Sequence, residues 1–152
     1  MERMQQNLAA IKEYLTLQGI KYWCDEKGSI TSGFRDARIN FRVSDELASA
    51  QLCFVKEVPD TAYSEVLDYL NKVNTILAEG HFEVKRGHGV SYRLSFRVGE
   101  RALQTSQVEE MLDYCSNMAG WFGAAFYRII DEKISAEDAF DQVVTEIVKT
   151  IN

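Results

Sequence analysis

The sequence predicts an α+β fold, in which helices pack an antiparallel sheet made of a three-strand meander and a hairpin. Apolar and polar residues alternate along three runs between residues 30 and 58, and the links between these runs are too short for crossover helices. A segment with helical spacing, residues 59–77, separates them from two further alternating runs, residues 82–84 and 90–98. We therefore expect residues 59–77 to form the helix on which the sheet packs.

Length, composition and charge limit the class of protein. The chain has 152 residues, of which 46% are apolar and 26% charged, which predicts one globular domain over residues 1–152. The formal net charge of −6 argues against general nucleic-acid binding. The longest apolar run, residues 119–126, is too short to cross a membrane, and residues 1–6 lack the features of a signal peptide. Three widely spaced cysteines fit reduced thiols, so we expect a cytoplasmic protein with no membrane contact.

The first half of the chain should contain one helix and a series of strands. Residues 2–19 are predicted to be a helix, because apolar residues recur on one face and Gly19 follows as a stop. A short strand over residues 20–24 and a turn at residues 25–28 come next. The expected meander then consists of residues 30–34, 37–43 and 50–58.

The central helix has its own boundary signals. Asp60 or Thr61 should cap its first turn, and Gly80 should end it. Asn71 and Asn74 lie near its apolar stripe, where leucine would pack better. Both amides are therefore candidates for a buried hydrogen bond with the sheet or with a second subunit.

Two helices are predicted after the hairpin. Ser106 and Glu109 match a capping box that opens a long helix ending at about Ile130. Gly120 and Gly123 inside this helix indicate close approach of another backbone. The same capping pattern opens a final helix at residues 135–152, which is a possible C-terminal extension.

No arrangement of residues predicts catalysis or metal binding. His81 and His88 have only Glu83 nearby as a further ligand, which is too few for a metal site. A cysteine nucleophile would need a histidine close in space, and Cys53 is the better candidate, followed by Cys24. Structural thiols are the simpler interpretation of both. We therefore expect no catalytic residue, no metal and no cofactor.

Four arginines alternate out of phase with the buried strand residues, so they should point to the same side of the sheet. They are Arg38, Arg42, Arg93 and Arg97. The commoner explanation is a solvated face with cross-strand charge pairs. The alternative is a basic open sheet that contacts an acidic segment of this protein or of a partner.

Exposed aromatic side chains are the second indication of a binding surface. Trp23 and Trp121 fall beside the main apolar phase of their elements. Aromatic residues on a surface often anchor a partner. Trp121 and Tyr127, which we place together on the outer side of the long helix, are the better candidates for an interface.

The order of elements resembles that of the YbjN family of bacterial proteins over most of residues 5–130. The matching segments are residues 70–74 in the central helix, residues 86–90 in the hairpin and residues 118–122 in the long helix. This resemblance implies a fold similar to that of type III secretion chaperones, which are small, acidic, cytosolic, usually dimeric proteins that bind extended segments of secreted clients. YbjN-like proteins are associated with the regulation of stress and motility.

We expect a non-enzymatic interaction domain, chaperone-like or regulatory, that forms a homodimer. It would capture a client or regulatory polypeptide through apolar patches and an exposed sheet edge. The expected partner-binding residues are Trp23, Arg38, Arg42, Arg93, Arg97, Trp121 and Tyr127. The alternative is a small-molecule-binding domain or an enzyme with a pocket between sheet and helices. A third possibility is a structural regulator that acts only as a dimer.

Overall fold

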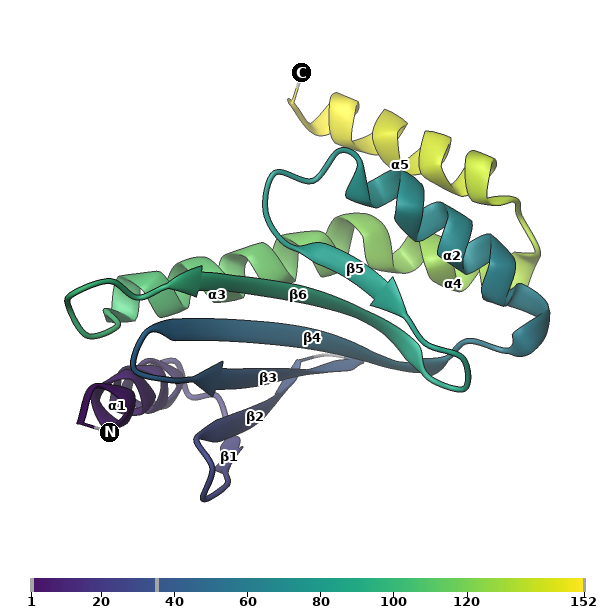
Figure 1. Cartoon of the computed structure of the whole chain (residues 1–152). Coiled ribbons are helices and arrows are strands. Elements are labelled where there is room, and N and C mark those ends of the chain that lie inside the picture. Colours follow the sequence, from purple (N-terminus) through teal and green to yellow (C-terminus); the bar gives the residue numbers. More distant parts are fainter. Residues whose placement is uncertain (1, 35, 152) are drawn as a thin grey trace.

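A single antiparallel sheet runs through the molecule, and helices pack against one of its faces (Figure 1). The computed structural model describes residues 2–34 and 36–151. The sheet has six strands in the order β1-β2-β3-β4-β6-β5. Their bounds are β1 Tyr22–Cys24, β2 Ser29–Phe34, β3 Ala37–Val43, β4 Leu47–Glu57, β5 His81–Val84 and β6 Gly89–Arg97. The predicted α+β class is confirmed.

The helices form a layer behind the sheet and a stack beyond β5. Their bounds are α1 Glu2–Leu17, α2 Asp60–Asn74, α3 Thr105–Met118, the π-helical segment η1 Ala119–Gly123, α4 Ala124–Glu132 and α5 Ala136–Ile151. Helix α1 contacts β3, and α3 contacts β4 and β6. Helix α2 lies beside β5, and α5 packs on α2 and α4, as Figure 1 shows.

The sheet is more continuous than the sequence suggests. The predicted meander gains β1 as a fourth strand, because Tyr22–Cys24 pairs antiparallel with β2. The hairpin β5–β6 joins the meander through β4, which pairs antiparallel with β6. The meander and the hairpin therefore form one sheet with one core.

Helix α1 follows the prediction closely. Its buried side carries Leu8, Ile11 and Leu15. Gly19 has a φ of 70°, and the N–H of Ile20 donates to the carbonyl of Leu15 at 2.9 Å, which is the expected glycine-based helix end.

Both boundary predictions for the central helix are wrong. No side chain caps the start of α2, where Pro59 occupies the N-cap position in extended conformation. The helix ends at Asn74, and Gly80 instead lies just before β5 with a φ of 73°. There the left-handed backbone passes directly against Tyr92, where a Cβ atom would clash.

One of the two asparagines forms the expected hydrogen bond. Asn74 Nδ2 donates to the carbonyl of Phe82 at 2.9 Å, and the Phe82 N–H donates to Asn74 Oδ1 at 2.8 Å. Asn71 is exposed, so that part of the prediction is wrong. The amide of Asn74 thus pairs with β5 in the way that a neighbouring strand would.

The predicted long helix is interrupted. The π-helical segment η1 separates α3 from α4, and such a segment accommodates an extra residue within a turn. The capping box uses Gln104 and Gln107 instead of Ser106 and Glu109, with the Gln104 N–H donating to Gln107 Oε1 at 2.8 Å. At α5 the predicted cap is confirmed, because the Asp138 N–H donates to Ser135 Oγ at 3.1 Å.

The glycines in η1 have a different role from the one predicted. A Cβ atom on Gly123 would lie 2.9 Å from the ring of Phe54, so the close neighbour is an aromatic side chain and not a backbone. Nothing lies within 4 Å of a Cβ placed on Gly120. Only Gly123 is therefore required for packing.

Buried polar groups tie the layers together. The hydroxyl of Tyr69 on α2 donates to the carbonyl of Phe122 at 3.0 Å, and burial raises the pKa of Tyr69. The fully buried Asn7 donates from Nδ2 to the carbonyl of Ser44 at 2.9 Å and accepts from the N–H of Leu103 at 2.7 Å.

Helix α5 adds Ala136, Ala139 and Val143 to the same core. The description of residues 135–152 as an extension of a single domain stays a prediction.

Candidate polypeptide-binding face

The sheet has one covered face and one uncovered face. Residues on the helix side are buried, for example Ile39, Leu52 and Leu94, while most of their neighbours in sequence are partly or fully exposed. The strand register aligns one row of exposed-side residues across all six strands. This row consists of Trp23, Thr31, Asn40, Gln51, Arg93 and His81. We call the surface that contains it the open face.

The four predicted arginines all lie on the open face. Arg38 is opposite Cys53 and Arg42 is opposite Ser49 on β4, while Arg93 is opposite Gln51 and Arg97 is opposite Leu47. All four side chains are exposed. The prediction that they share one side of the sheet is confirmed.

Charge pairing on the open face is sparse. Arg93 Nη2 lies 3.5 Å from Glu83 Oε1, and both side chains are partly exposed, which makes this a weak pair. Within residues 2–34 and 36–151, no ion pair shorter than 4.0 Å involves Arg38, Arg42 or Arg97. Cross-strand charge pairs therefore account for only one of the four arginines.

A shallow hollow lies at one end of this face, where β4 departs from regular pairing between Cys53 and Glu57. It measures about 240 Å³, and its ionisable lining residues include Arg38, Lys85, His88 and Glu83. Burial raises the pKa of the Cys53 thiol, and the nearby positive charge of Arg38 offsets this only in part. The thiol at the floor of the hollow is consequently protonated near neutral pH, which does not favour a nucleophile.

Apart from His88, which lines the same hollow as Cys53, the remaining histidine and cysteine candidates lie elsewhere. His81 Nε2 lies 3.9 Å from Glu83 Oε2, and His88 lies in the turn after β5. Among the residues that the structure describes, no three His, Cys, Asp or Glu side chains are placed to hold a metal ion. Cys24 is exposed, and burial raises the pKa of Cys115 to about 12.

The three aromatic candidates lie on different surfaces. Trp23 is 68% exposed and belongs to the open face beside the arginines. Trp121 is 42% exposed and lines a groove between α4 and α5. Tyr127 lies on another side of the helix, where its hydroxyl donates to Asp36 Oδ2 at 2.6 Å and Lys56 Nζ lies 5.4 Å from the ring centre. The expected grouping of Trp121 with Tyr127 on one outer side of the helix is wrong, because residues six positions apart lie about 120° apart around a regular α-helix. Tyr127 contacts Asp36, whereas Trp121 lies beside α5.

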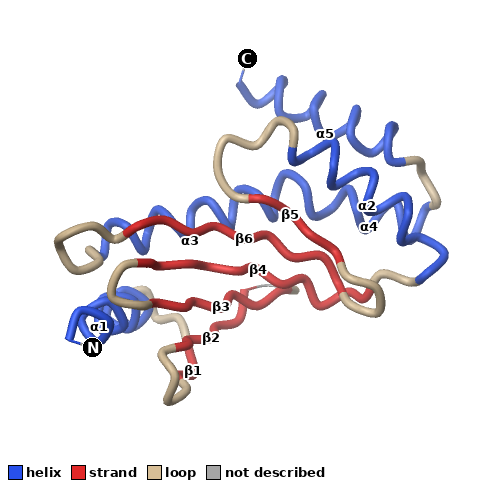
Figure 2. The backbone as a smooth tube through the Cα atoms, viewed as in Figure 1, coloured by secondary structure: helices blue, strands red, loops and turns tan. Residues whose placement is uncertain are grey.

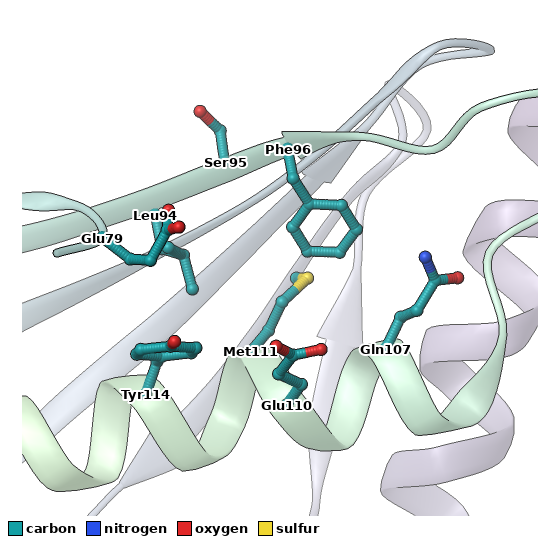
Figure 3. A pocket seen from close by; sticks show the side chains of 8 residues that line it. All are labelled: Glu79, Leu94, Ser95, Phe96, Gln107, Glu110, Met111 and Tyr114. Carbon is teal, nitrogen blue, oxygen red and sulfur yellow. The ribbon is translucent and has the colours of Figure 1, made fainter.

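A second surface feature was not predicted from the sequence. Strand β5 is shorter than β6: its first residue, His81, pairs with Arg93, and its last, Val84, pairs with Val90. The end of β6 after Arg93 therefore extends past β5. Figure 2 shows a loop, not a strand, between α2 and the start of β5. Beside this free stretch, a pocket of about 170 Å³ opens between β6 and α3 (Figure 3). The mismatch in length between residues 81–84 and 89–97 is the sequence signal that could have indicated it.

This arrangement, an antiparallel sheet open on one face and packed by helices on the other, defines a two-layer α+β domain. Comparison with solved structures agrees. The chain is similar to YbjN of E. coli, a proposed transcription regulator, with a TM-score of 0.57 and 12% identity, covering 72% of this chain and 83% of that one. It is also similar to the Yersinia pestis type III secretion chaperone SycH, solved in complex with a stable fragment of YscM2, with a TM-score of 0.53 and 13% identity, covering 74% and 96%.

These comparisons confirm the predicted fold, which is shared by YbjN and a type III secretion chaperone. No family model matches the sequence, and no curated protein matches it. In the described part of the chain, no helix is both long and apolar enough to cross a membrane.

Proposed function

We propose that this protein is a non-enzymatic binding domain, chaperone-like or regulatory, that captures an extended acidic segment of a partner polypeptide on its open face. One observation carries the proposal. Arg38, Arg42 and Arg97 are exposed on an uncovered sheet and form no ion pair with another described residue, in a chain whose net charge is −6. An acidic protein thus carries exposed arginines together on one uncovered surface, where they can attract an acidic ligand.

The spacing of the arginines suits an extended ligand. Arg38 and Arg42 are four residues apart on β3, as are Arg93 and Arg97 on β6, which places each pair roughly 13 Å apart along its strand. Alternate side chains of an extended peptide recur about every 7 Å, so acids at alternate or every fourth position could reach them. Guanidinium groups bind carboxylates in bidentate geometry, which favours acidic side chains over other anions of a peptide.

The solved neighbours support a polypeptide partner. SycH is a secretion chaperone solved with a fragment of another protein, and YbjN is a proposed regulator; neither is named as an enzyme. We further propose that the protein acts in the cytoplasm and forms a homodimer, for which Trp121, Val148 and Ile151 supply exposed apolar surface. Light scattering over a range of concentrations tests the homodimer: a monomer mass at every concentration would remove that part of the proposal.

A small-molecule-binding domain is the second candidate. The pocket between β6 and α3 favours it, because it lies between sheet and helix and carries Glu79 and Glu110 at its rim. Its volume of about 170 Å³ is below the usual range for ligand pockets, roughly 300–1,000 Å³. A screen of metabolites by thermal shift tests this candidate, and a hit abolished by altering Glu110 would favour it over the polypeptide.

Charge reversal tests the main proposal. Affinity capture from the native host should be compared between the native protein and the double variant Arg38→Glu/Arg93→Glu. The matched control is Arg101→Glu/Arg128→Glu, which changes the net charge equally but alters residues outside the open face. We expect the open-face variant alone to lose a specific acidic polypeptide. Retention of every captured partner by both variants would refute the proposal.

A further inference from the structure

The end of strand β6 has backbone groups that no neighbouring strand within residues 2–34 and 36–151 satisfies. Phe82 turns its N–H and C=O away from β6, toward Asn74, so Tyr92 opposite it turns its own groups toward β4. Alternation then directs the N–H and C=O of Ser95 and Arg97 to the side of β6 where β5 has already ended.

Independent bonds agree with this phase. The Val98 N–H donates to the carbonyl of Glu46 at 2.8 Å, on the β4 side. Gly80 lies against the carbonyl of Arg93, on the β5 side. The backbone N–H and C=O groups of even-numbered residues in β6 thus point toward β4. Those of odd-numbered residues point toward the opposite edge. In the described part of the chain, no backbone hydrogen bond to Ser95 or Arg97 is made on that edge.

The pocket lies directly beside this free edge. Its apolar lining comes from Leu94 and Phe96 on β6 and from Met111 and Tyr114 on α3. In Figure 3 these side chains lie between the strand and the helix, while Ser95 points away from α3 toward the open face. The pocket of about 170 Å³ has room for one apolar side chain.

We propose that β6 accepts an added strand from a partner polypeptide, alongside Leu94–Arg97, in which acidic and apolar residues alternate. The proposal rests on the proposed function and names the binding mode and the sequence pattern of the partner. Strand addition supplies backbone hydrogen bonds, and alternate side chains of the added strand fall on opposite faces of the sheet.

Each face of the sheet selects one half of the pattern. On the open face, the added side chains would lie beside Arg93 and Arg97, which favours acids. On the helix side, the added side chain would enter the pocket between Leu94 and Phe96 and be buried. Glu79 and Glu110 at the rim disfavour an acid there, so that position should be apolar.

Charge argues against a second copy of this chain at the same edge. In a two-fold arrangement centred on Ser95, Arg97 of one copy would lie opposite Arg93 of the other. Like charges directly opposite each other across strands are destabilising. An acidic strand reverses the sign of that interaction.

The test uses two short synthetic peptides of the same composition, one alternating Glu and Leu and the other carrying them in blocks. Fluorescence anisotropy would measure their affinity for the native protein and for Ser95→Pro, with Ser95→Ala as the matched control. Proline removes the N–H of the free edge without removing a bond to β4, and alanine keeps it. We expect the alternating peptide to bind preferentially, and to bind Ser95→Pro about tenfold more weakly, while Ser95→Ala binds as the native protein does.

A second measurement needs no variant. Amide hydrogen exchange at Ser95 and Arg97 of the native protein should slow when the alternating peptide is bound. Two versions of the peptide, N-methylated at odd or at even positions, should differ in affinity. The version whose methyl groups replace the N–H groups that point toward β6 should bind more weakly. This result remains decisive if Ser95→Pro fails to fold, which circular dichroism would reveal.

The outcomes separate this proposal from the proposed function. One outcome would overturn strand addition and leave the open face as the site. In it, binding requires Arg38, Ser95→Pro does not change the affinity, and amide exchange at Ser95 does not slow. No binding of either peptide at millimolar concentration would count against both proposals. Self-association of the peptide-free protein that Ser95→Pro abolishes would assign the edge to a second copy and overturn the partner strand.

Discussion

Two adjoining stretches of the same sheet edge are treated differently in this molecule. Along β5, the amide of Asn74 pairs with both backbone groups of Phe82 and closes the edge. Along the end of β6, Ser95 and Arg97 have no comparable partner in the described structure. Exposed edges promote unwanted pairing, and natural sheets usually block them. The contrast supports the proposal that the open stretch accepts a strand of a partner, because Asn74 shows how this chain can pair the backbone groups of an edge.

The two stretches meet at Gly80. Its left-handed backbone brings the chain from the α2–β5 loop into pairing at His81–Arg93, in contact with Tyr92. The hydroxyl of Tyr92 donates to the carbonyl of Glu79 at 2.8 Å, which fixes where β5 begins. The position of this turn therefore determines how much of β6 is left free.

Gly80→Ala should produce the largest effect on this boundary. A Cβ atom would meet the hydroxyl of Tyr92 and the carbonyl of Arg93, in a left-handed conformation. Overpacking and backbone strain together should lower the free energy of unfolding by about 3 kcal/mol. Urea denaturation followed by circular dichroism measures this change.

Gly19→Ala is the matched control for backbone strain alone. Gly19 has a similar φ of 70°, but nothing lies within 4 Å of a Cβ at that position. Its substitution should cost only about 1 kcal/mol. Equal losses in the two variants would show that contact with Tyr92 does not define the boundary.

Asn74→Ala should convert the closed stretch into a second open one. It leaves the N–H and C=O of Phe82 without partners in a half-buried position, which should cost about 2 kcal/mol of unfolding free energy. Asn71→Ala, three residues earlier on an exposed position, should change stability by less than about 0.5 kcal/mol. Urea denaturation compares the pair, and faster amide exchange at Phe82 in the Asn74 variant alone would show that the edge has opened. Unchanged exchange at Phe82 would contradict the assigned role of Asn74.

The residues on the covered face of the sheet could be predicted from the alternation of apolar and polar residues. Strict alternation in residues 37–43 and 90–98 fixes which side chains face the helices, and the same phase places Arg38 and Arg93 on the open face. Local periodicity determines the side of a sheet to which a residue points. It does not determine which strands become neighbours, so the joining of β4 to β6 required the structure.

The errors concern features that depend on contacts between distant segments. The role of Gly80 is set by Tyr92, twelve positions away. The π-helical segment η1, which interrupts the predicted long helix, has no signal in the local apolar spacing. The buried amide of Asn7 looks like a surface residue in its helix, yet it binds the backbone at Ser44 and Leu103. No single-segment pattern carries these contacts.

Cys53 gives the smallest effect and sharpens the comparison between edge and face. Because burial raises the pKa of its thiol above the ordinary value, less thiolate is present at pH 8 than in an exposed cysteine. Alkylation of Cys53 should therefore be slow and should accelerate only at a higher pH than alkylation of an exposed cysteine. Mass spectrometry of iodoacetamide-treated Cys24→Ser protein would follow this site without the exposed thiol.

Peptide protection of Cys53 then reports how far the ligand extends. An alternating peptide confined to the edge beside Ser95 should leave the alkylation rate of Cys53 unchanged. A longer segment that crosses the open face toward Arg38, opposite Cys53, should slow it several-fold. Arg38→Glu should abolish that protection while leaving the amide protection at Ser95 in place. Loss of both signals together would mean that the face and the edge bind the segment as one site.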